Sequence, residues 1–392
     1  MNQFNDLNIA LVYDRVNKFG GAERVLLTLH EMFPNAPLYT SVYDSKKAPW
    51  ANVFPKIYTS FLQKIPILKN HHELMGWLMP IAFESFNFKK YDLVISVTSE
   101  AAKGIITCTN TLHICYMLTP TRYLWSGKEF YLNNPPKIFK IFPFYKIVSW
   151  PFLTYAKWWD KVASTRPDKI IAISTEVQRR IKKYYNRDSE IIFPPIILHR
   201  KNSFLRGLRS QNGAASYSFL LDANYYLYVG RLVKYKKIDL LVEVFNELNL
   251  PLVIVGTGSE ERMLKLKAKN NIKFLGNIND EELAKVYSKA KAFLMPQEED
   301  FGITSLEAQS FGVPIIAYRK GGALDTVVEN KTGVFFDDQN KESLKQAIAK
   351  FDKIVFNHKY LINNVKNFSK ENFKRRLQRS LVRAYSSGWW WN

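Results

Sequence analysis

The chain repeatedly alternates short β-branched runs with segments of helical periodicity. NIALVYD (8–14) leads into GGAERVLLTLHEMF, YDLVISVTS (91–99) leads into EAAKGIIT, and KIIAIST (169–175) leads into EVQRRIKKYY. Strands that alternate with helices indicate βαβ units, whose strands pair in parallel. The first half of the chain is therefore predicted to form a doubly wound α/β domain.

The same pattern starts again at YYLYVGRL (225–232). Further strand-like runs follow at 251–259, 272–278, 290–297, 313–319 and 333–338, with helical segments such as DLLVEVFNEL between them. A chain of 392 residues is also too long for one ordinary core. We therefore expect an α/β fold of two Rossmann-like doubly wound domains that face each other across a cleft. In such sheets, ligands bind beyond the carboxyl ends of the strands.

The polar, basic stretch 197–219 separates the two series and is typical of a linker. The predicted organisation is an N-terminal domain, a linker, a C-terminal domain and a final helix with a tail. The boundaries are 1–197, 198–222, 223–365 and 366–392.

The formal net charge of +21 predicts an anionic partner: nucleic acid, an anionic membrane leaflet or phosphorylated substrates. The N-terminus lacks the basic start and long apolar core of a signal peptide, and no stretch of about 18 apolar residues occurs. Cys108 and Cys115 lie in no C-x-x-C or His/Cys cluster, so we expect buried free thiols in a reducing compartment. These features predict a cytoplasmic protein that contacts membranes only at their surface.

The segment 131–162 does not follow the strand–helix pattern, because it mixes prolines and lysines with many aromatic residues. One interpretation is a helical excursion that packs on the first domain. The other is an amphipathic element whose rings lie at headgroup depth while its lysines contact anionic lipid.

Two glycine pairs stand at strand-to-helix turns, Gly20-Gly21 and Gly321-Gly322. Glycine lets the backbone approach a ligand closely, and a helix N-terminus favours negative charge. Either pair can also be a simple turn, and Gly20-Gly21 is not part of a G-x-G-x-x-G motif.

The stretch YVGRLVKYKKIDLL (228–241) places two cations after a strand. The strand is predicted to end at Gly230, and Arg231 and Lys236 follow in one loop. A planar guanidinium and a point-charge ammonium together suit a diphosphate, although basic residues can also form a solvated surface.

The stretch QEEDFGITSLEAQSFGVP (297–314) predicts a strand, a tight entry at Gly302 and a short helix. The unpaired N–H groups of Ile303 and Thr304 at the start of this helix form an anion site.

Two acids flank this helix start. Glu299 is expected in the loop and Glu307 inside the helix. Glu307 could accept two hydrogen bonds from a vicinal diol such as ribose, and Glu299 could accept from the hydroxyls of a second sugar. A diphosphate between two polyols describes a nucleotide sugar.

By these residues the chain resembles the retaining GT-B glycosyltransferases of family four, the glycosyl transferases group 1. The resemblance covers about residues 225–336 and rests on the E-x7-E motif, the Gly-Arg-Leu…Lys loop, the Phe301-Gly302 pair and the Gly-Gly loop. The N-terminal half is similar through Gly20-Gly21-Ala22-Glu23 and HICYMLTPTRYLW (113–125). The latter string resembles the branch that contains mannosyltransferases of O-antigen and capsule assembly.

The resemblance implies a role for each part of the chain. Residues 1–197 would be the acceptor domain, 223–365 the nucleotide-sugar-binding domain, and 366–392 a helix that returns to the N-terminal domain. The catalytic residues would be Arg231, Lys236 and Glu299. The donor would be held by Gly20, Gly21, Gly230, Glu299, Phe301, Gly302, Ile303, Thr304, Glu307, Gly321 and Gly322.

The resemblance also implies a retaining hexosyltransferase that needs neither cofactor nor metal, and no D-x-D motif occurs. The expected donor is GDP-mannose, and the expected acceptor is lipid-linked or a saccharide, met at an anionic membrane surface in surface-polysaccharide synthesis. Leu118 stands where many members have a histidine, and His113 is nearby but could be a buried structural residue. Two alternatives stay open: a nucleotide-sugar isomerase or epimerase on the same frame, and, from charge alone, a nucleic-acid-binding protein.

Overall fold

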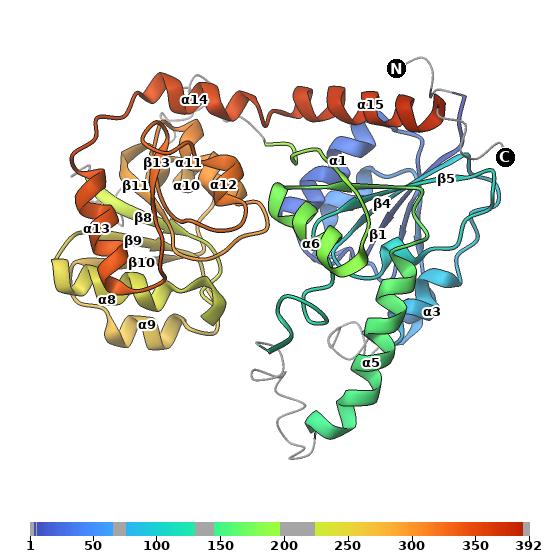
Figure 1. The fold of residues 1–392 in the computed structure, drawn as a ribbon, viewed down its shortest axis with the longest axis horizontal. Helices are drawn as coiled ribbons and strands as arrows, with labels where there is room; N and C mark the ends of the chain where they lie inside the picture. Colours follow the sequence, from blue (N-terminus) through green and yellow to red (C-terminus); the bar gives the residue numbers. More distant parts are fainter. Residues whose placement is uncertain (1–3, 5, 66–75, 130–144, 197–223, 387–392) are drawn as a thin grey trace. The chain divides into compact units, whose positions relative to one another are not determined.

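The computed structural model describes residues 4, 6–65, 76–129, 145–196 and 224–386 (Figure 1). They form two compact units. Unit 1 comprises residues 1–195 and 373–392, and unit 2 comprises residues 196–372. The predicted linker, 198–222, lies outside the described residues.

Unit 1 is built on a seven-stranded parallel sheet of order β3-β2-β1-β4-β5-β6-β7. Its strands are β1 (Ile9–Tyr13), β2 (Leu38–Thr40), β3 (Ile57–Thr59), β4 (Leu93–Thr98), β5 (Leu112–Met117), β6 (Lys169–Ala172) and β7 (Glu190–Ile191). Its helices are α1 (Gly21–Met32), η2 (Pro49–Val53), η3 (Phe61–Lys64), α3 (Met79–Glu84), η5 (Ala102–Gly104), α5 (Tyr145–Ala163) and α6 (Thr175–Tyr185).

Unit 2 is built on a six-stranded parallel sheet of order β10-β9-β8-β11-β12-β13. Its strands are β8 (Tyr225–Val229), β9 (Leu252–Val255), β10 (Ile272–Gly276), β11 (Ala290–Met295), β12 (Ile315–Tyr318) and β13 (Gly333–Phe336). Its helices are η8 (Lys234–Lys236), α8 (Ile238–Leu248), α9 (Glu261–Lys267), α10 (Asp280–Lys289), α11 (Ile303–Ser310), α12 (Ala323–Thr326), α13 (Lys341–Phe351) and α14 (His358–Lys366).

The central strands form where the sequence has uninterrupted apolar runs. All residues of β1, β4, β9 and β12 are buried, as expected for parallel strands that are covered by helices on both faces. In unit 2, one apolar cluster packs α8 and α13 on one face of the sheet, and a second packs residues of α10 and α11 on the other. The α/β prediction of two Rossmann-like domains is confirmed.

The segment after β4 differs from its predicted helix. EAAKGIIT forms only the short η5, and the carboxylate of Asp14 accepts hydrogen bonds from the backbone N–H groups of Ala101 (2.9 Å) and Ala102 (2.8 Å).

The part of the aromatic segment that is described forms α5, with Pro151 inside it. One side of α5 is buried and includes Trp159 and Asp160, whereas Phe152, Tyr155 and Trp158 are exposed. The carboxylate of Asp160 accepts four hydrogen bonds, from Lys103 Nζ (2.6 Å), Thr121 Oγ1 (2.6 Å), Trp125 Nε1 (2.7 Å) and Tyr185 OH (2.6 Å). These bonds attach α5 to η5, to the loop after β5 and to α6. Residues 131–144 of the predicted segment lie outside the described residues.

The last helix, α15 (Lys370–Ser386), begins at the end of unit 2, and from Phe373 onward it belongs to unit 1. The Phe373 ring packs edge-on against Tyr116 of β5 at 5.7 Å. Arg383 Nη2 donates to Glu190 Oε1 of β7 at 2.5 Å, and Lys374 Nζ donates to Glu31 Oε2 of α1 at 2.8 Å. The chain therefore returns to complete the first unit.

Both cysteines are free thiols. Cys115 is fully buried in β5, and this burial raises the pKa of its thiol to about 12. Cys108 is partly exposed, which departs from the prediction that both are buried, because it lies in the loop before β5 and not in the strand.

Candidate active site

The site in unit 2 lies where the strand order reverses. β8 neighbours both β9 and β11: β9 and β10 extend the sheet on one side, and β11 to β13 on the other. The loops that leave the carboxyl ends of β8 and β11 therefore diverge at this point. Such a reversal is where open α/β sheets bind ligands.

An ion pair joins these two loops. Lys236, in η8 after β8, donates from Nζ to Glu299 Oε1 in the loop after β11. The side chains are only 13% and 18% exposed, so the pair is partly removed from water. Gln297 Nε2 donates to the same carboxylate oxygen of Glu299 at 2.7 Å. The structure thus brings together two of the residues that the sequence predicted, and adds Gln297, which the sequence reading did not single out.

Gln297 is itself 3% exposed, and its buried Oε1 has no hydrogen-bond partner among the described residues. A buried amide oxygen without a partner is unfavourable unless a ligand or water supplies a donor. In the sequence, Gln297 directly precedes the acidic loop, and this position was the signal that could have identified it as a site residue.

Glu307 lies inside α11, as predicted, and is 8% exposed. Tyr287 OH donates to Glu307 Oε2 at 3.3 Å, and the Tyr287 ring stacks on Phe311 at 5.5 Å. Gly302, the residue just before α11, has a φ of +91°, a left-handed conformation that glycine adopts without strain. The side chain of Glu307 is oriented by the hydroxyl group of Tyr287, because the Tyr287 ring is itself packed on Phe311.

The pair Gly321-Gly322 packs directly on the loop that carries Glu299. A Cβ at Gly321 would lie 2.3 Å from the backbone oxygen of Glu299, and one at Gly322 would lie 2.2 Å from the Phe301 backbone. Gly322 N also donates to Glu299 O at 2.8 Å. This pair is therefore needed to position the acidic loop, whether or not its backbone also touches a ligand.

The loop after β8 depends on glycines that the sequence reading did not single out. A Cβ at Gly256 would lie 2.0 Å from Gly230 O, and one at Gly258 would lie 2.2 Å from Leu232 O. The GTG sequence after β9 therefore lets two strand-end loops lie against each other. Arg231 extends from this loop into solvent, where its Nη2 donates to Tyr235 OH at 2.7 Å.

The predicted donor-binding residues Phe301, Ile303 and Thr304 differ in how far they are buried. Phe301 is 3% exposed and its ring contacts Phe368 at 5.7 Å, so its side chain lies in the interior of unit 2. Ile303 and Thr304 are partly exposed at the first positions of α11.

In unit 1 the strand order reverses between β1 and β4. Asp14 follows β1 and accepts hydrogen bonds from Thr98 Oγ1 (2.8 Å) and Ser99 N (2.7 Å) at the end of β4. It also accepts the two hydrogen bonds from Ala101 N and Ala102 N described above. Gly20 and Gly21 end the same β1 loop and begin α1, where Gly20 is the residue before the first turn. Asp14 is thus a positioning residue that the sequence reading did not single out, because its partners are about 85 residues away.

Glu100 lies at the same edge and is 9% exposed. It forms an ion pair with Arg15 and accepts from Tyr123 OH at 3.2 Å. A carboxylate with a cation and a phenol at the strand ends is a polar cluster suited to hydroxyl groups.

His113 is fully buried inside the sheet, where its Nε2 lies 2.8 Å from Ser96 Oγ. Burial, aided by Arg166 and Arg187, lowers the pKa of His113 to about 3, so the ring is neutral at neutral pH. Leu118 is partly exposed and its N–H donates to Thr98 O at 2.8 Å. His113 therefore does not replace a histidine at position 118.

Among the described residues, no cluster of three or more His, Cys, Asp or Glu side chains could bind a metal ion. No helix in the described part of the chain has both the length and the apolar character that crossing a bilayer requires.

Known proteins match parts of this chain. Residues 214–368 match the family model described as glycosyl transferases group 1. An uncharacterized glycosyltransferase of Methanocaldococcus jannaschii is 26% identical over 216 residues, covering 54% of this chain and 57% of that protein. A GDP-mannose-dependent alpha-mannosyltransferase of Corynebacterium glutamicum is 37% identical over 122 residues, covering 31% of this chain and 29% of that protein. The chain therefore spans little more than half of the first relative and less than a third of the second.

Comparison with solved structures extends over both units. The crystal structure of Anabaena HepE in complex with UDP matches with a TM-score of 0.66 at 16% identity, covering 96% of this chain and all of that one. At this identity the match establishes the fold alone. Residues 214–368 thus match the group 1 glycosyl transferase model, and the chain has the two-domain fold of the GT-B glycosyltransferases.

Proposed function

We propose that the protein is a retaining hexosyltransferase that moves mannose from GDP-mannose to a lipid-linked or saccharide acceptor in surface-polysaccharide synthesis. The observation that carries the proposal is the Lys236–Glu299 ion pair at the strand-order reversal of the group 1 domain. A cation and an acid held together there can contact the diphosphate and the sugar of one donor.

The charges of the site suit a diphosphate leaving group. Lys236 and Arg231 would stabilise the negative charge that grows on the diphosphate as the glycosidic bond loosens. Glu299 would accept hydrogen bonds from the donor sugar, and Glu307 from the ribose diol.

The reaction requires little acid–base chemistry from the protein. The phosphate oxygen of the donor takes the proton of the acceptor hydroxyl on the face that the diphosphate leaves, so the anomeric configuration is retained. Charge stabilisation by the two basic side chains lets the step proceed without a metal, and the protein contributes orientation. Glu100, with Arg15 and Tyr123, is the candidate for binding an acceptor hydroxyl in unit 1.

The donor is tested by thermal unfolding of the whole chain with GDP-, UDP- and ADP-sugars, because a ligand that binds only the folded state raises the Tm. We expect GDP-mannose to give the largest increase, and Glu307→Ala to abolish it. The named mannosyltransferase relative favours GDP, whereas HepE was crystallised with UDP. A larger rise in Tm with a UDP-sugar would identify that sugar nucleotide as the donor in place of GDP-mannose. If no nucleotide sugar raised the Tm, the proposal would be rejected.

The alternative of an isomerase or epimerase is tested by incubating the donor alone. We expect the donor to stay unchanged until an acceptor is added. A new nucleotide sugar formed without acceptor would contradict transfer as the reaction.

We also propose that the exposed side of α5 contacts an anionic membrane surface. Phe152, Tyr155 and Trp158 are 53%, 44% and 62% exposed, and the Phe152 ring lies 6.3 Å from that of the exposed Trp77. Lys157 and Lys161 are exposed on the same helix. Aromatic rings beside lysines match the chemistry of an anionic bilayer interface.

Replacing Phe152, Tyr155 and Trp158 together with serine should lower sedimentation with anionic liposomes at least about tenfold, while donor binding is kept. The matched control is Met263→Ser with Leu266→Ser in unit 2, which removes apolar side chains that are 54% and 71% exposed. Unchanged sedimentation of the α5 variant, or retention on DNA but not on liposomes, would reject the membrane proposal.

A further inference from the structure

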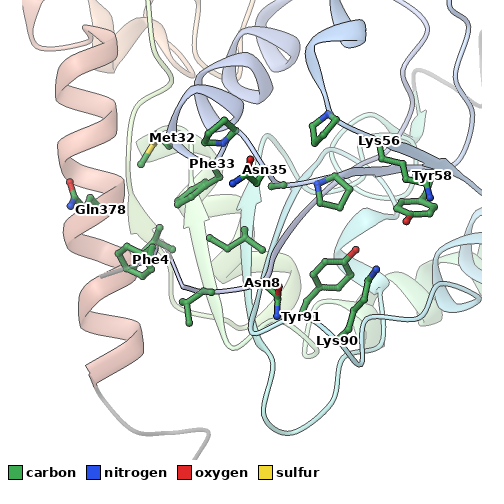
Figure 2. A pocket seen from close by; sticks show the side chains of 17 residues that line it. Phe4, Asn8, Met32, Phe33, Asn35, Lys56, Tyr58, Lys90, Tyr91 and Gln378 are labelled. Carbon is green, nitrogen blue, oxygen red and sulfur yellow. The ribbon is translucent and has the colours of Figure 1, made fainter. Parts of the chain in front are cut away.

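A cavity of about 630 Å³ lies in unit 1 at the amino ends of the strands (Figure 2). Its walls come from the residues that precede or begin β1, β2, β3 and β4, from the end of α1 and from α15. The lining residues are Phe4, Leu7, Asn8, Ile9, Met32, Phe33, Pro34, Asn35, Ala36, Pro37, Pro55, Lys56, Tyr58, Lys90, Tyr91, Gln378 and Leu381.

This position separates the cavity from the reaction edge of unit 1. All strands of the sheet run parallel, so Asp14, Glu100 and the glycine pair of α1 lie at the opposite, carboxyl edge. The proposed transfer reaction therefore does not use this cavity.

The two ends of the cavity differ in chemistry. Figure 2 shows Phe4, Met32 and Phe33 at one end, on the side of α15. At the other end are two lysines, each beside an aromatic ring: Lys56 Nζ lies 4.7 Å from the centre of the Tyr58 ring, and Lys90 Nζ lies 5.2 Å from that of Tyr91.

The charge at this end is positive, and both lysines are exposed to solvent. None of the 17 lining residues is acidic, and in the described part of the chain neither Lys56 nor Lys90 takes part in an ion pair. A ligand with one anionic group would accept a charge-assisted hydrogen bond from each lysine in place of solvent.

The wall at the lysine end is held by internal contacts. Tyr91 OH and Tyr39 OH are 2.9 Å apart, and the Tyr39 ring stacks on Tyr58 at 4.6 Å. Asn8 N donates to Asp92 Oδ2 at 2.8 Å, which holds the chain before β1 against the start of β4. A cavity of this volume, largely preformed, is in the range of small-molecule sites.

We propose that this cavity binds a small anionic amphiphile: a single phosphate or carboxylate at the lysine end, and an apolar chain or ring at the Phe4–Phe33 end. Its volume of about 630 Å³ is that of a small-molecule site, which favours one molecule over a membrane surface. The ligand class is therefore distinct from the nucleotide sugar of the proposed reaction.

Calorimetric titration of the full chain with octyl phosphate below its micelle concentration tests the proposal. We expect saturable binding, at least about tenfold tighter than that of butyl phosphate, because each buried methylene contributes about fourfold. Octyl glucoside, with the same chain and no charge, and inorganic phosphate, with no chain, should each bind at least about tenfold more weakly. GDP and UDP should not compete.

The matched variants are Lys56→Gln with Lys90→Gln, against Lys89→Gln. Lys89 is an exposed neighbour of Lys90 that does not line the cavity. The double variant should weaken octyl phosphate binding at least about tenfold with an unchanged Tm, and Lys89→Gln should not. Equal effects of both variants, equal binding of octyl glucoside, or competition by nucleotides would overturn the proposal.

Discussion

Replacing Lys236 or Glu299 with alanine should lower the rate of sugar transfer at least about a hundredfold, the order expected when one charge-stabilising contact is lost. The two side chains form one ion pair at the strand-order reversal, and Gln297 donates to the same carboxylate. We therefore expect them to act as a unit. The double variant should be little slower than either single variant, because the second substitution removes a partner whose orientation is already lost.

The measurement is initial rate at saturating and at limiting donor. Lys236→Ala should reduce kcat more than it raises KM, since its charge matters most as the diphosphate leaves. Lys234→Ala is the matched control, because Lys234 lies in the same turn and is exposed. Near-normal rates for both single variants, or an equal loss in Lys234→Ala, would contradict the assignment.

Replacing Asp160 with alanine should lower the free energy of unfolding of unit 1 by about 3–5 kcal/mol, the range for breaking a buried ion pair. The side chains of Lys103 and Asp160 are 1% and 2% exposed. Without the carboxylate, Lys103 would keep a buried charge, and Trp125 and Tyr185 would lose their acceptor.

Chemical denaturation followed by tryptophan fluorescence measures this loss. Adding Lys103→Met to Asp160→Ala should recover part of it, since no buried charge then remains. Asp188→Ala is the matched control: its ion pair with Lys182 is formed by a carboxylate that is 93% exposed, so the change should stay below about 1 kcal/mol. An equally small change for Asp160→Ala would refute the proposed anchoring of α5.

The central strands could be predicted because burial on both faces requires nearly continuous apolar residues, as in LVISVT of β4. Three short strands of unit 1 could not. β2 and β3 have three residues each and β7 has two, too short for any period to show. Their pairing is decided by the strand beside them and not by their own residues.

The predicted acids and cations of unit 2 could be located because each lies in the loop or helix that follows a recognisable strand. Residues whose role depends on a distant partner could not be found in this way. Asp14 meets the end of β4 only after folding, and Gly256 matters because Gly230 approaches it. Gln297 lies close to Glu299 in the sequence, but only the structure shows that its side chain donates a hydrogen bond to that carboxylate.

The sequence by itself determined two parallel α/β domains and the order of the loops that carry the candidate donor residues, because burial and turn chemistry act over a few neighbouring residues. Only the tertiary structure decided which of these loops touch, that His113 is buried and neutral, and that a cavity with two lysines opens at the amino edge of the first sheet. The physical reason is that such contacts join residues tens of positions apart, and no local pattern records a distance between them.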